Sequence, residues 1–383
     1  MKLMKLFLGV IAVLGSIASA QTGAGIKDAA NHKGTSNNDK KGNPEWSFVV
    51  SGDSRNCGNV IMPAIAAGVE KNGAAFYWHL GDLRAIYITD EDYQHEPEHR
   101  GSAVDRDAYL KDAWDDFIKN QLAIFGSTPV FVGIGNHETT PPKTRDQFIV
   151  QFAKWLDAPA LHKQRQADGQ QDSALKAYFH WIQGGVDFIY LDDATHDQFA
   201  PDQVSWLEGV LQRAAANPEV RAVVVGMHAA LPDSLASGHS MSDWAIGVES
   251  GRRVYNDLLG FQQKTKKHVY TLASHSHFYM SGIFDSDYWR ANGGVLPGWI
   301  VGTAGAVRYA LPPGAARAKE AQTKIYGFLL AKVRADGSID FQFQEIKQKD
   351  IPDKVQHRYT PEFVGFCFDS NTNFGNAPAP AHQ

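Results

Sequence analysis

Cysteine is scarce in this sequence, and its scarcity excludes one class of metal site. Cys57 and Cys367 are the two cysteines among 383 residues, so a zinc site built from several thiolates cannot form. In an oxidising compartment the two thiols can pair, which would join the carboxyl-terminal tail to the neighbourhood of Asp53. We expect this disulfide. Two unpaired thiols are the alternative, because sequence alone does not supply the geometry that a bridge needs.

Long apolar runs are missing beyond the amino terminus. The one such run, residues 6–17, follows Lys2 and Lys5 and closes on Ala18-Ser-Ala20, the pattern of a secretory signal peptide at residues 1–20. No later stretch is long and uncharged enough to cross a bilayer. We therefore expect a periplasmic or secreted mature protein without a membrane span.

An excess of basic charge is also missing. The chain has 37 Lys and Arg residues against 42 Asp and Glu residues, a formal net charge of -5, which argues against a nucleic-acid partner. A G-x-x-x-x-G-K-[ST] phosphate loop is absent. The G-x-S-x-G elbow of serine hydrolases is absent too, since Gly238-His-Ser-Met-Ser242 lacks the last glycine.

Composition divides the chain into a leader, one domain and a tail. Residues 21–44 are polar and predict a flexible leader. Residues 45–349 are expected to form a single domain with insertions near 84–127 and 139–176, because the polar clusters described next have to meet. The acidic run 90–98 within the first insertion predicts a solvated lid, and residues 350–383 predict a C-terminal tail that frays beyond Asp369.

Strand-like runs that end in polar clusters are what the sequence does contain. The five clusters with metal-ligating residue types are Ser51-Gly-Asp53-Ser-Arg55, Leu80-Gly-Asp82-Leu, Gly135-Asn136-His137-Glu138, Gly226-Met-His228 and Ser274-His275-Ser-His277. Each follows a β-branched or aromatic stretch, so in an open α/β sheet the clusters would converge at the carboxyl ends of the strands. Asp, Asn and His are ligands for first-row transition metals. The pattern therefore predicts a polynuclear metal site.

The order of these motifs resembles the calcineurin-like metallophosphoesterase superfamily, purple acid phosphatases included. Phe188–Asp193 and Gln203–Leu207 also fit its pattern of a central strand followed by a helix. The resemblance implies an α/β fold, a four-layered α/β/β/α sandwich with two central mixed sheets and the metal site at the strand carboxyl ends. It further implies two divalent or trivalent transition metal ions (Mn, Fe or Zn) as cofactors and a small-molecule phosphate ester as substrate.

The resemblance also assigns a role to each candidate residue. Asp53 would bind the first ion, Asp82 would bridge both ions, Asn136, His228 and His275 would complete the second, and His277 would return to the first. His137 would assist the leaving oxygen, with Glu138 as its orienting partner. A bridging carboxylate brings two cations to about 3.5–4 Å, a spacing that clamps the attacking and leaving oxygens of an in-line displacement.

Arg55 departs from the superfamily pattern. Many members have D-x-H in the first motif, whereas arginine stands here at the histidine position and cannot ligate a metal. Three explanations compete: Arg55 grips a phosphate oxygen, Tyr87 replaces the missing ligand, or the first metal site is weak. The spacing from Asp82 to Tyr87 is two residues longer than the G-D-x-x-Y motif requires. We favour the first explanation, in which Arg55 binds a phosphate oxygen of the substrate.

Five further residues have both a functional and a structural interpretation. His79 orients a ligand or simply packs in its strand, and packing is favoured. Asp192 and Asp193 could hydrogen-bond the site's histidines or could cap a turn, and the sequence favours neither interpretation. His239 touches substrate or lies solvated in its Ser/Gly-rich loop, and the solvated loop is favoured. Tyr309 lines a pocket or belongs to the core.

The leading functional hypothesis is an exported, dinuclear-metal-dependent hydrolase of phosphate esters, in which a metal-bridging hydroxide attacks phosphorus. A purple acid phosphatase-like monoesterase is one alternative. A ligand-binding protein on a decayed phosphoesterase scaffold is the other, and Arg55 motivates it. The enzyme is favoured because His137, Asn136 and the S-H-x-H pair are all present.

Overall fold

The first of two large β-sheets carries the amino-terminal clusters at one edge. In the computed structural model, which describes residues 46–170 and 172–374, its strand order is β13-β12-β1-β2-β3. The strands are β1 (Trp46–Ser51), β2 (Tyr77–His79), β3 (Val130–Val132), β12 (Tyr326–Val333) and β13 (Ile339–Ile346). β1, β2 and β3 run parallel, and the register pairs Ser51 with His79 and His79 with Val132. The residues that follow each strand therefore emerge side by side.

The second sheet carries the carboxyl-terminal clusters in the same way. Its order is β11-β8-β9-β7-β6-β5-β4. The strands are β4 (Phe179–Gln183), β5 (Val186–Tyr190), β6 (Ala222–Gly226), β7 (His268–Ala273), β8 (Tyr279–Ser281), β9 (Gly298–Val301) and β11 (Glu320–Gln322). β5, β6 and β7 are parallel neighbours, with Gly226 opposite Leu272. A short pair, β10 (Arg308–Tyr309) and β14 (Thr372–Asn373), lies apart from both sheets.

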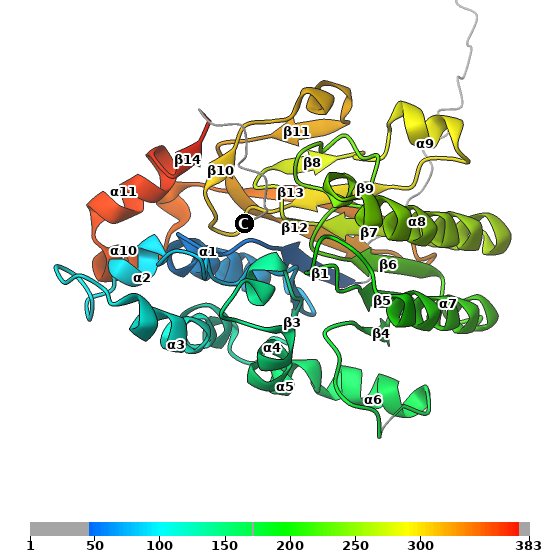
Figure 1. Cartoon of the computed structure of the whole chain (residues 1–383), viewed down its shortest axis with the longest axis horizontal. Helices are drawn as coiled ribbons and strands as arrows, with labels where there is room; N and C mark the ends of the chain where they lie inside the picture. Colours follow the sequence, from blue (N-terminus) through cyan, green and yellow to red (C-terminus); the bar gives the residue numbers. More distant parts are fainter. Residues whose placement is uncertain (1–45, 171, 375–383) are drawn as a thin grey trace, which may run out of the picture. The chain divides into compact units, whose positions relative to one another are not determined.

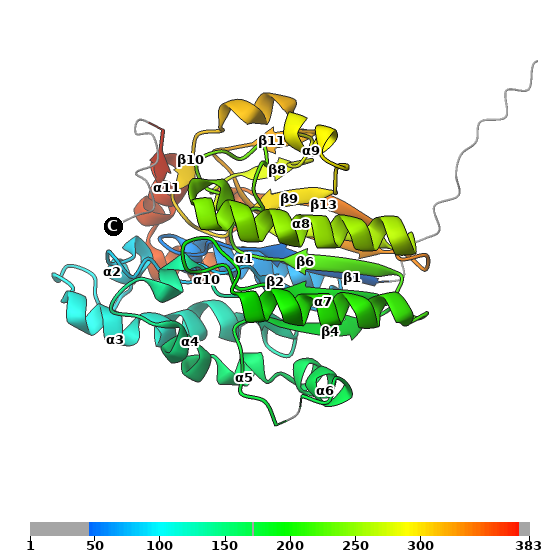
Figure 2. The same cartoon turned by 45° about the vertical axis from the view of Figure 1, so that its right-hand side comes forward.

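Helices connect and cover the strands (Figure 1). They are α1 (Gly58–Lys71), α2 (Glu91–Gln94), α3 (Arg106–Phe117), α4 (Arg145–Gln151), α5 (Ala153–Leu156), α6 (Pro159–Ala167), α7 (Pro201–Ala216), α8 (Ala245–Thr265), α9 (Asp287–Ala291), α10 (Asp353–Tyr359) and α11 (Pro361–Asp369). Figure 2 shows α7 and α8 side by side in front of β6. Among the described residues, no helix is both long and apolar enough to cross a membrane.

Alternation along the strands divides the apolar side chains between two cores. In β6, Val224 belongs to a core that both sheets share, whereas Val223 and Val225 belong to a second core that includes residues of α7 and α8. The rings of Phe48 in β1 and Phe188 in β5 lie 5.0 Å apart, edge to face, so the two sheets face each other. The predicted α/β class with two mixed sheets is confirmed, and the four-layer order stays a prediction.

The acidic run 90–98 is not a solvated lid, and that prediction was wrong. Arg84 is fully buried, and its guanidinium forms ion pairs with Asp90, Asp92 and Asp116. A buried cation needs such partners because leaving its charge unpaired in the interior is costly. Asp90 also accepts hydrogen bonds from the backbone N–H of Asn56 at 2.6 Å and of Ala85 at 3.0 Å. The insertion therefore ties together the loops that follow β1 and β2.

The predicted boundary of a carboxyl-terminal tail at residue 350 is also wrong. α10 and α11 pack onto the domain, since α10 contacts α1 and Cys367 in α11 forms the predicted disulfide with Cys57. The apolar residues of the segment explain this packing, because Val364 and Cys367 are fully buried. β14 then pairs with β10 beyond Asp369. The predicted signal peptide and leader (residues 1–44) and the end of the tail lie outside the described residues.

Replacing both cysteines, as Cys57→Ser/Cys367→Ser, should lower the free energy of unfolding by about 2–5 kcal/mol, because the bond closes a very long loop of chain. The two positions are 310 residues apart. Urea unfolding of the oxidised proteins followed by circular dichroism measures the loss, and wild type reduced with dithiothreitol is the matched control. Equal stability of the oxidised wild type and the double variant would contradict the assignment.

Candidate metal centre

The loops after β1, β2, β3, β6 and β7 meet at one place between the two sheets. The carbonyl oxygen of Leu80 accepts hydrogen bonds from His228 Nδ1 at 2.9 Å and from Ser274 Oγ at 2.9 Å. Asp53 Oδ2 accepts one from the backbone N–H of His275 at 2.7 Å. These bonds link the first sheet to the second at the carboxyl ends of their strands. The convergence predicted from the five sequence clusters is therefore present.

Unusual backbone conformations position several of the ligand-type side chains. Asp53, Asp82 and His275 have φ angles of 60°, 59° and 63°, in the left-handed region that residues with a Cβ seldom adopt. Such conformations are concentrated at functional sites, where the surrounding structure holds them in place. Gly135 allows the loop after β3 to approach closely, because a Cβ there would collide with Asp82 Oδ1. The chain thus accepts local strain to bring Asp82 to the centre.

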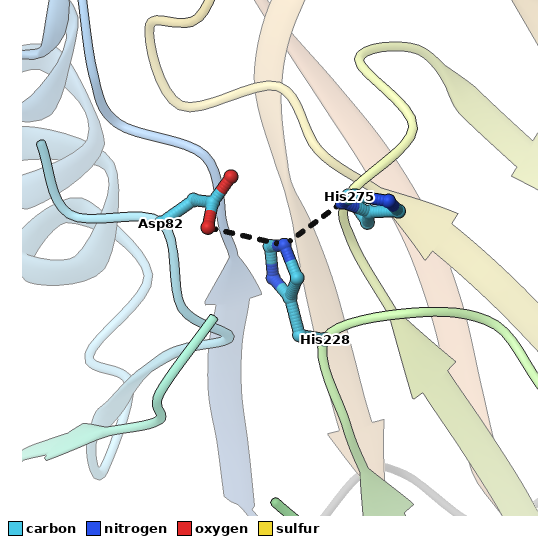
Figure 3. Close-up of side chains that lie close together, drawn as sticks. All are labelled: Asp82, His228 and His275. Carbon is cyan, nitrogen blue, oxygen red and sulfur yellow. Dashed lines mark hydrogen bonds and ion pairs between the residues drawn. The ribbon is translucent and has the colours of Figure 1, made fainter. Parts of the chain in front are cut away.

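Two groups of ligand-type side chains share Asp82. One group is Asp82, His228 and His275 (Figure 3), and the other is Asp53, Asp82 and His277; in each group the ligand atoms lie within 4.8 Å of one another. Asn136 joins the first group, with its Oδ1 3.0 Å from His228 Nε2. The six residues predicted as metal ligands are thus brought together, and the predicted bridging residue is the shared one.

The hydrogen bonds of the imidazole rings test whether these residues fit metal ions. His228 Nδ1 and His277 Nδ1 face the backbone carbonyls of Leu80 and Val307, at 2.9 and 2.6 Å. Because a carbonyl only accepts, each Nδ1 carries a proton and each ring turns its Nε2 to the centre. There His228 Nε2 lies 3.2 Å from Asp82 Oδ1, and His277 Nε2 lies 3.1 Å from Asp53 Oδ1.

Burial and the charge of Arg55 lower the pKa of His277, so its Nε2 presents a lone pair to the carboxylate of Asp53, an arrangement that suits a cation between the two atoms. The buried Asp82 Oδ2 has no hydrogen-bond partner, as expected of an oxygen reserved for another ligand. The donor set of carboxylate, amide oxygen and imidazole suits divalent or trivalent transition ions. The residues present therefore fit metal ions at both groups.

Electrostatics agree with this interpretation. Burial alone would raise the pKa of Asp82, but His137, His228 and Arg55 outweigh it and hold the pKa well below its usual range, so the carboxylate is ionised. Burial alone would lower the pKa of His228, yet the carboxylates of Asp82 and Asp53 raise it well above its ordinary value. The carboxylates thus draw positive charge to the space between them.

His137 borders the centre with a fixed ring. Its Nδ1 donates to the carbonyl oxygen of Ala85 at 2.5 Å, and its Nε2 lies 3.5 Å from Asp82 Oδ2. Burial, followed by the positive charge of Arg55, lowers the pKa of His137 to about 4. The resting ring is therefore neutral at pH 7 and presents a lone pair to the centre.

Glu138 does not orient His137 as predicted. Its carboxylate accepts hydrogen bonds from the backbone N–H groups of Asp82 and Leu83, both at 2.9 Å, and of Gly135 at 2.8 Å. No hydrogen bond joins it to the His137 ring among the described residues. Buried N–H groups need acceptors, so Glu138 fixes the loops after β2 and β3 and thereby positions Asp82.

Arg55 reaches the centre, and two tyrosines hold it there. Its Nη1 donates to Tyr87 Oη at 3.2 Å, and its Nη2 approaches Tyr309 Oη at 3.4 Å and His277 Nε2 at 3.1 Å. Burial would lower the pKa of Arg55, but its neighbours Tyr309, Tyr87, Asp82 and Asp53 raise it, so the guanidinium stays charged. Tyr87 touches the site through Arg55, although its sequence spacing does not match a ligand motif.

His239 lies beside the centre, in agreement with the less favoured of its two interpretations. It is 8% exposed, so the prediction of a solvated loop was wrong. Its ring centre lies 5.1 Å from that of His275 and 4.8 Å from that of Tyr309, and neither ring nitrogen has a hydrogen-bond partner. The Oγ of Ser276 holds the loop by donating to the carbonyl oxygen of His239. No local sequence signal indicates this long-range contact.

The other undecided residues support the centre from outside. His79 is buried, and its Nε2 lies 2.9 Å from Ser54 Oγ. Asp193 accepts hydrogen bonds from the backbone N–H groups of His228 and Ala229, at 3.0 and 2.8 Å. It therefore fixes the backbone of the loop after β6 and does not contact the imidazole of His228 through these bonds. Asp192 instead pairs with Arg145 at 2.6 Å.

Comparisons with known proteins place this geometry in a familiar fold. No model of a protein family matches the sequence, and no curated protein matches it. A purple acid phosphatase from seeds of yellow lupin (Lupinus luteus) has a TM-score of 0.53 at 17% identity, covering 78% of this chain and 51% of that chain. This chain thus spans about half the length of the lupin phosphatase.

Two further solved structures overlap with similar portions of the chain. A dimetal phosphatase from Danio rerio has a TM-score of 0.48 at 12% identity, covering 79% of this chain and 97% of that one. A protein named PhoD has a TM-score of 0.49 at 13% identity, covering 80% and 72%. From the sheets, the site and the lupin similarity together, the chain has the fold of the calcineurin-like metallophosphoesterases.

Proposed function

We propose that this chain is an exported, metal-dependent hydrolase of phosphate esters. The observation that carries the proposal is the position of Asp82 in two groups of ligands at once. Asp53 and His277 would hold one ion, Asn136, His228 and His275 the other, and Asp82 both. Two transition ions (Mn, Fe or Zn) would supply Lewis-acid stabilisation of phosphoryl oxygens and make hydroxide available near neutral pH. Export rests on the signal-peptide pattern of residues 1–20.

The residues around the centre are suited to bind a phosphoryl group. Among the described residues, Arg55 Nε is buried without a hydrogen-bond partner, and no carboxylate oxygen lies closer to the guanidinium than Asp82 Oδ2 at 3.8 Å. A charged planar donor with spare N–H groups suits the oxygens of a phosphate. Arg55 would therefore orient the substrate and stabilise negative charge as it develops.

His137 would transfer a proton at Nε2. Its neutral ring cannot donate there at rest, because Nδ1 carries the proton to the Ala85 carbonyl. An anionic phosphate beside the ring favours the charged imidazolium and raises the pKa of His137. Nε2 then holds a proton close to the leaving oxygen. Binding of the substrate would thereby promote protonation of His137 at Nε2.

Arg55 also motivates the competing hypothesis of a binding protein without turnover. Its contact with His277 Nε2 involves a group that would otherwise ligate the first ion. Such a protein would bind phosphate esters and leave them intact. An assay for phosphate release with Mn²⁺, Fe²⁺ or Zn²⁺ present separates the two hypotheses, and paired mono- and diester substrates test the monoesterase alternative.

Asp82→Ala should abolish release of p-nitrophenol from p-nitrophenyl phosphate and should also abolish high-affinity Mn²⁺ binding, because both groups of ligands lose their shared member. Steady-state assays and elemental analysis of the purified protein measure the two effects. Asp107→Ala, which removes an exposed carboxylate of α3, is the control and should match wild type. Undiminished turnover by Asp82→Ala would refute the proposed site.

His137→Ala should lower kcat for an alkyl phosphate ester by about 10²–10⁴-fold, the usual range for loss of a proton donor, with bound metal unchanged. The decrease should be smaller for p-nitrophenyl phosphate, because p-nitrophenolate leaves without a proton. His162→Ala, an exposed histidine of α6, serves as control. Equal losses for both substrates would contradict a proton-donor role for His137.

A further inference from the structure

The Nε2 atom of His277 is contacted from two sides. On the opposite side of the ring, Nδ1 donates to the Val307 carbonyl at 2.6 Å. Arg55 Nη2 lies 3.1 Å from Nε2 with hydrogen-bond geometry. Because a guanidinium has donors and no acceptor, Nε2 must accept this bond through its lone pair. The hydrogen bonds thus fix the protonation state of the ring.

The same lone pair is the one that a metal ion would need. His277 Nε2 lies 3.1 Å from Asp53 Oδ1 and belongs to the group Asp53, Asp82 and His277. An imidazole nitrogen has a single lone pair in the plane of its ring. It can accept a hydrogen bond from Arg55 or bind an ion, and it cannot do both fully at the same time.

The other group of ligands has no such competitor among the described residues. His228 Nε2 faces Asn136 Oδ1 at 3.0 Å, Asp82 Oδ1 at 3.2 Å and His275 Nδ1 at 3.1 Å, and none of these atoms belongs to an arginine or a lysine. Arg55 approaches Asp82 through the oxygen Oδ2, at 3.8 Å. The arginine therefore acts on the two groups unequally.

We infer that Arg55 competes with a metal ion for His277, so that the chain binds one ion tightly at Asp82, His228 and His275 and a second ion more weakly at Asp53, Asp82 and His277. The inference rests on the proposed metal centre and goes further by ranking its two positions. The hydroxyls of Tyr87 and Tyr309 accept hydrogen bonds from the guanidinium and keep it beside His277. The fixed positive charge of Arg55 also opposes a cation beside it.

Calorimetric titration of Mn²⁺ into the chelator-treated full chain tests the inference. Wild type should show two affinities at least about tenfold apart. Arg55→Met should tighten the weaker one by about 10- to 100-fold, the range for release of a charge-assisted hydrogen bond, and should change the tighter one much less. Electron paramagnetic resonance provides a second readout: at one equivalent of Mn²⁺ per chain, wild type should give the signal of isolated ions.

Arg290→Ala is the control for charge, because it removes an equal charge from an exposed ion pair with Asp285 and should leave both affinities unchanged. Equal affinities in wild type would overturn the inference, and that titration needs no folded variant. An equal gain at both positions in Arg55→Met would show an effect of charge alone and would overturn it too. No binding of Mn²⁺ would overturn the proposed function as well, whereas two equal affinities with turnover would overturn this inference alone.

Discussion

The buried carboxylate of Asp82 is the group on which the rest of the site depends. It is fully enclosed, it faces His137, His228 and Arg55, and one of its oxygens has no hydrogen-bond partner. An ionised carboxylate in such a place is stable only when positive charge compensates it. His228 and Arg55 supply part of that charge, and the two groups of ligand-type side chains are suited to metal ions that would supply the rest.

Much of the fold serves to hold Asp82 and its neighbours in place. Glu138 accepts hydrogen bonds from backbone N–H groups around Asp82. Asp90 accepts hydrogen bonds from the loops after β1 and β2, and Asp193 accepts one from the backbone N–H of His228 and so fixes that loop. The Cys57–Cys367 disulfide anchors the carboxyl-terminal helices two residues beyond Arg55. Positions within the site are thus set by buried polar contacts from several distant segments, which suits a centre whose ligands must keep their geometry.

The sequence was sufficient to predict the site's core because its signals are local. A strand followed by a polar cluster is visible in any short window. The parallel registers of β1, β2 and β3 in one sheet and of β6 and β7 in the other bring five such windows to one centre. The contacts that depend on tertiary structure were not predictable. Buried Arg84 turns an acidic run from surface into core, and His239 becomes buried through a distant loop contact. Tyr87 contacts Arg55 although its spacing from Asp82 does not match a ligand motif, and the residue before it, Ile86, has a φ of 63°.

The most direct test of the account is a crystal structure of the protein soaked with Mn²⁺, with anomalous diffraction recorded at the manganese edge. We expect an anomalous peak from a manganese ion bound by Asp82, His228 and His275, the group drawn in Figure 3. A fully loaded crystal showing manganese elsewhere on the chain, with these three side chains free of metal, would contradict it.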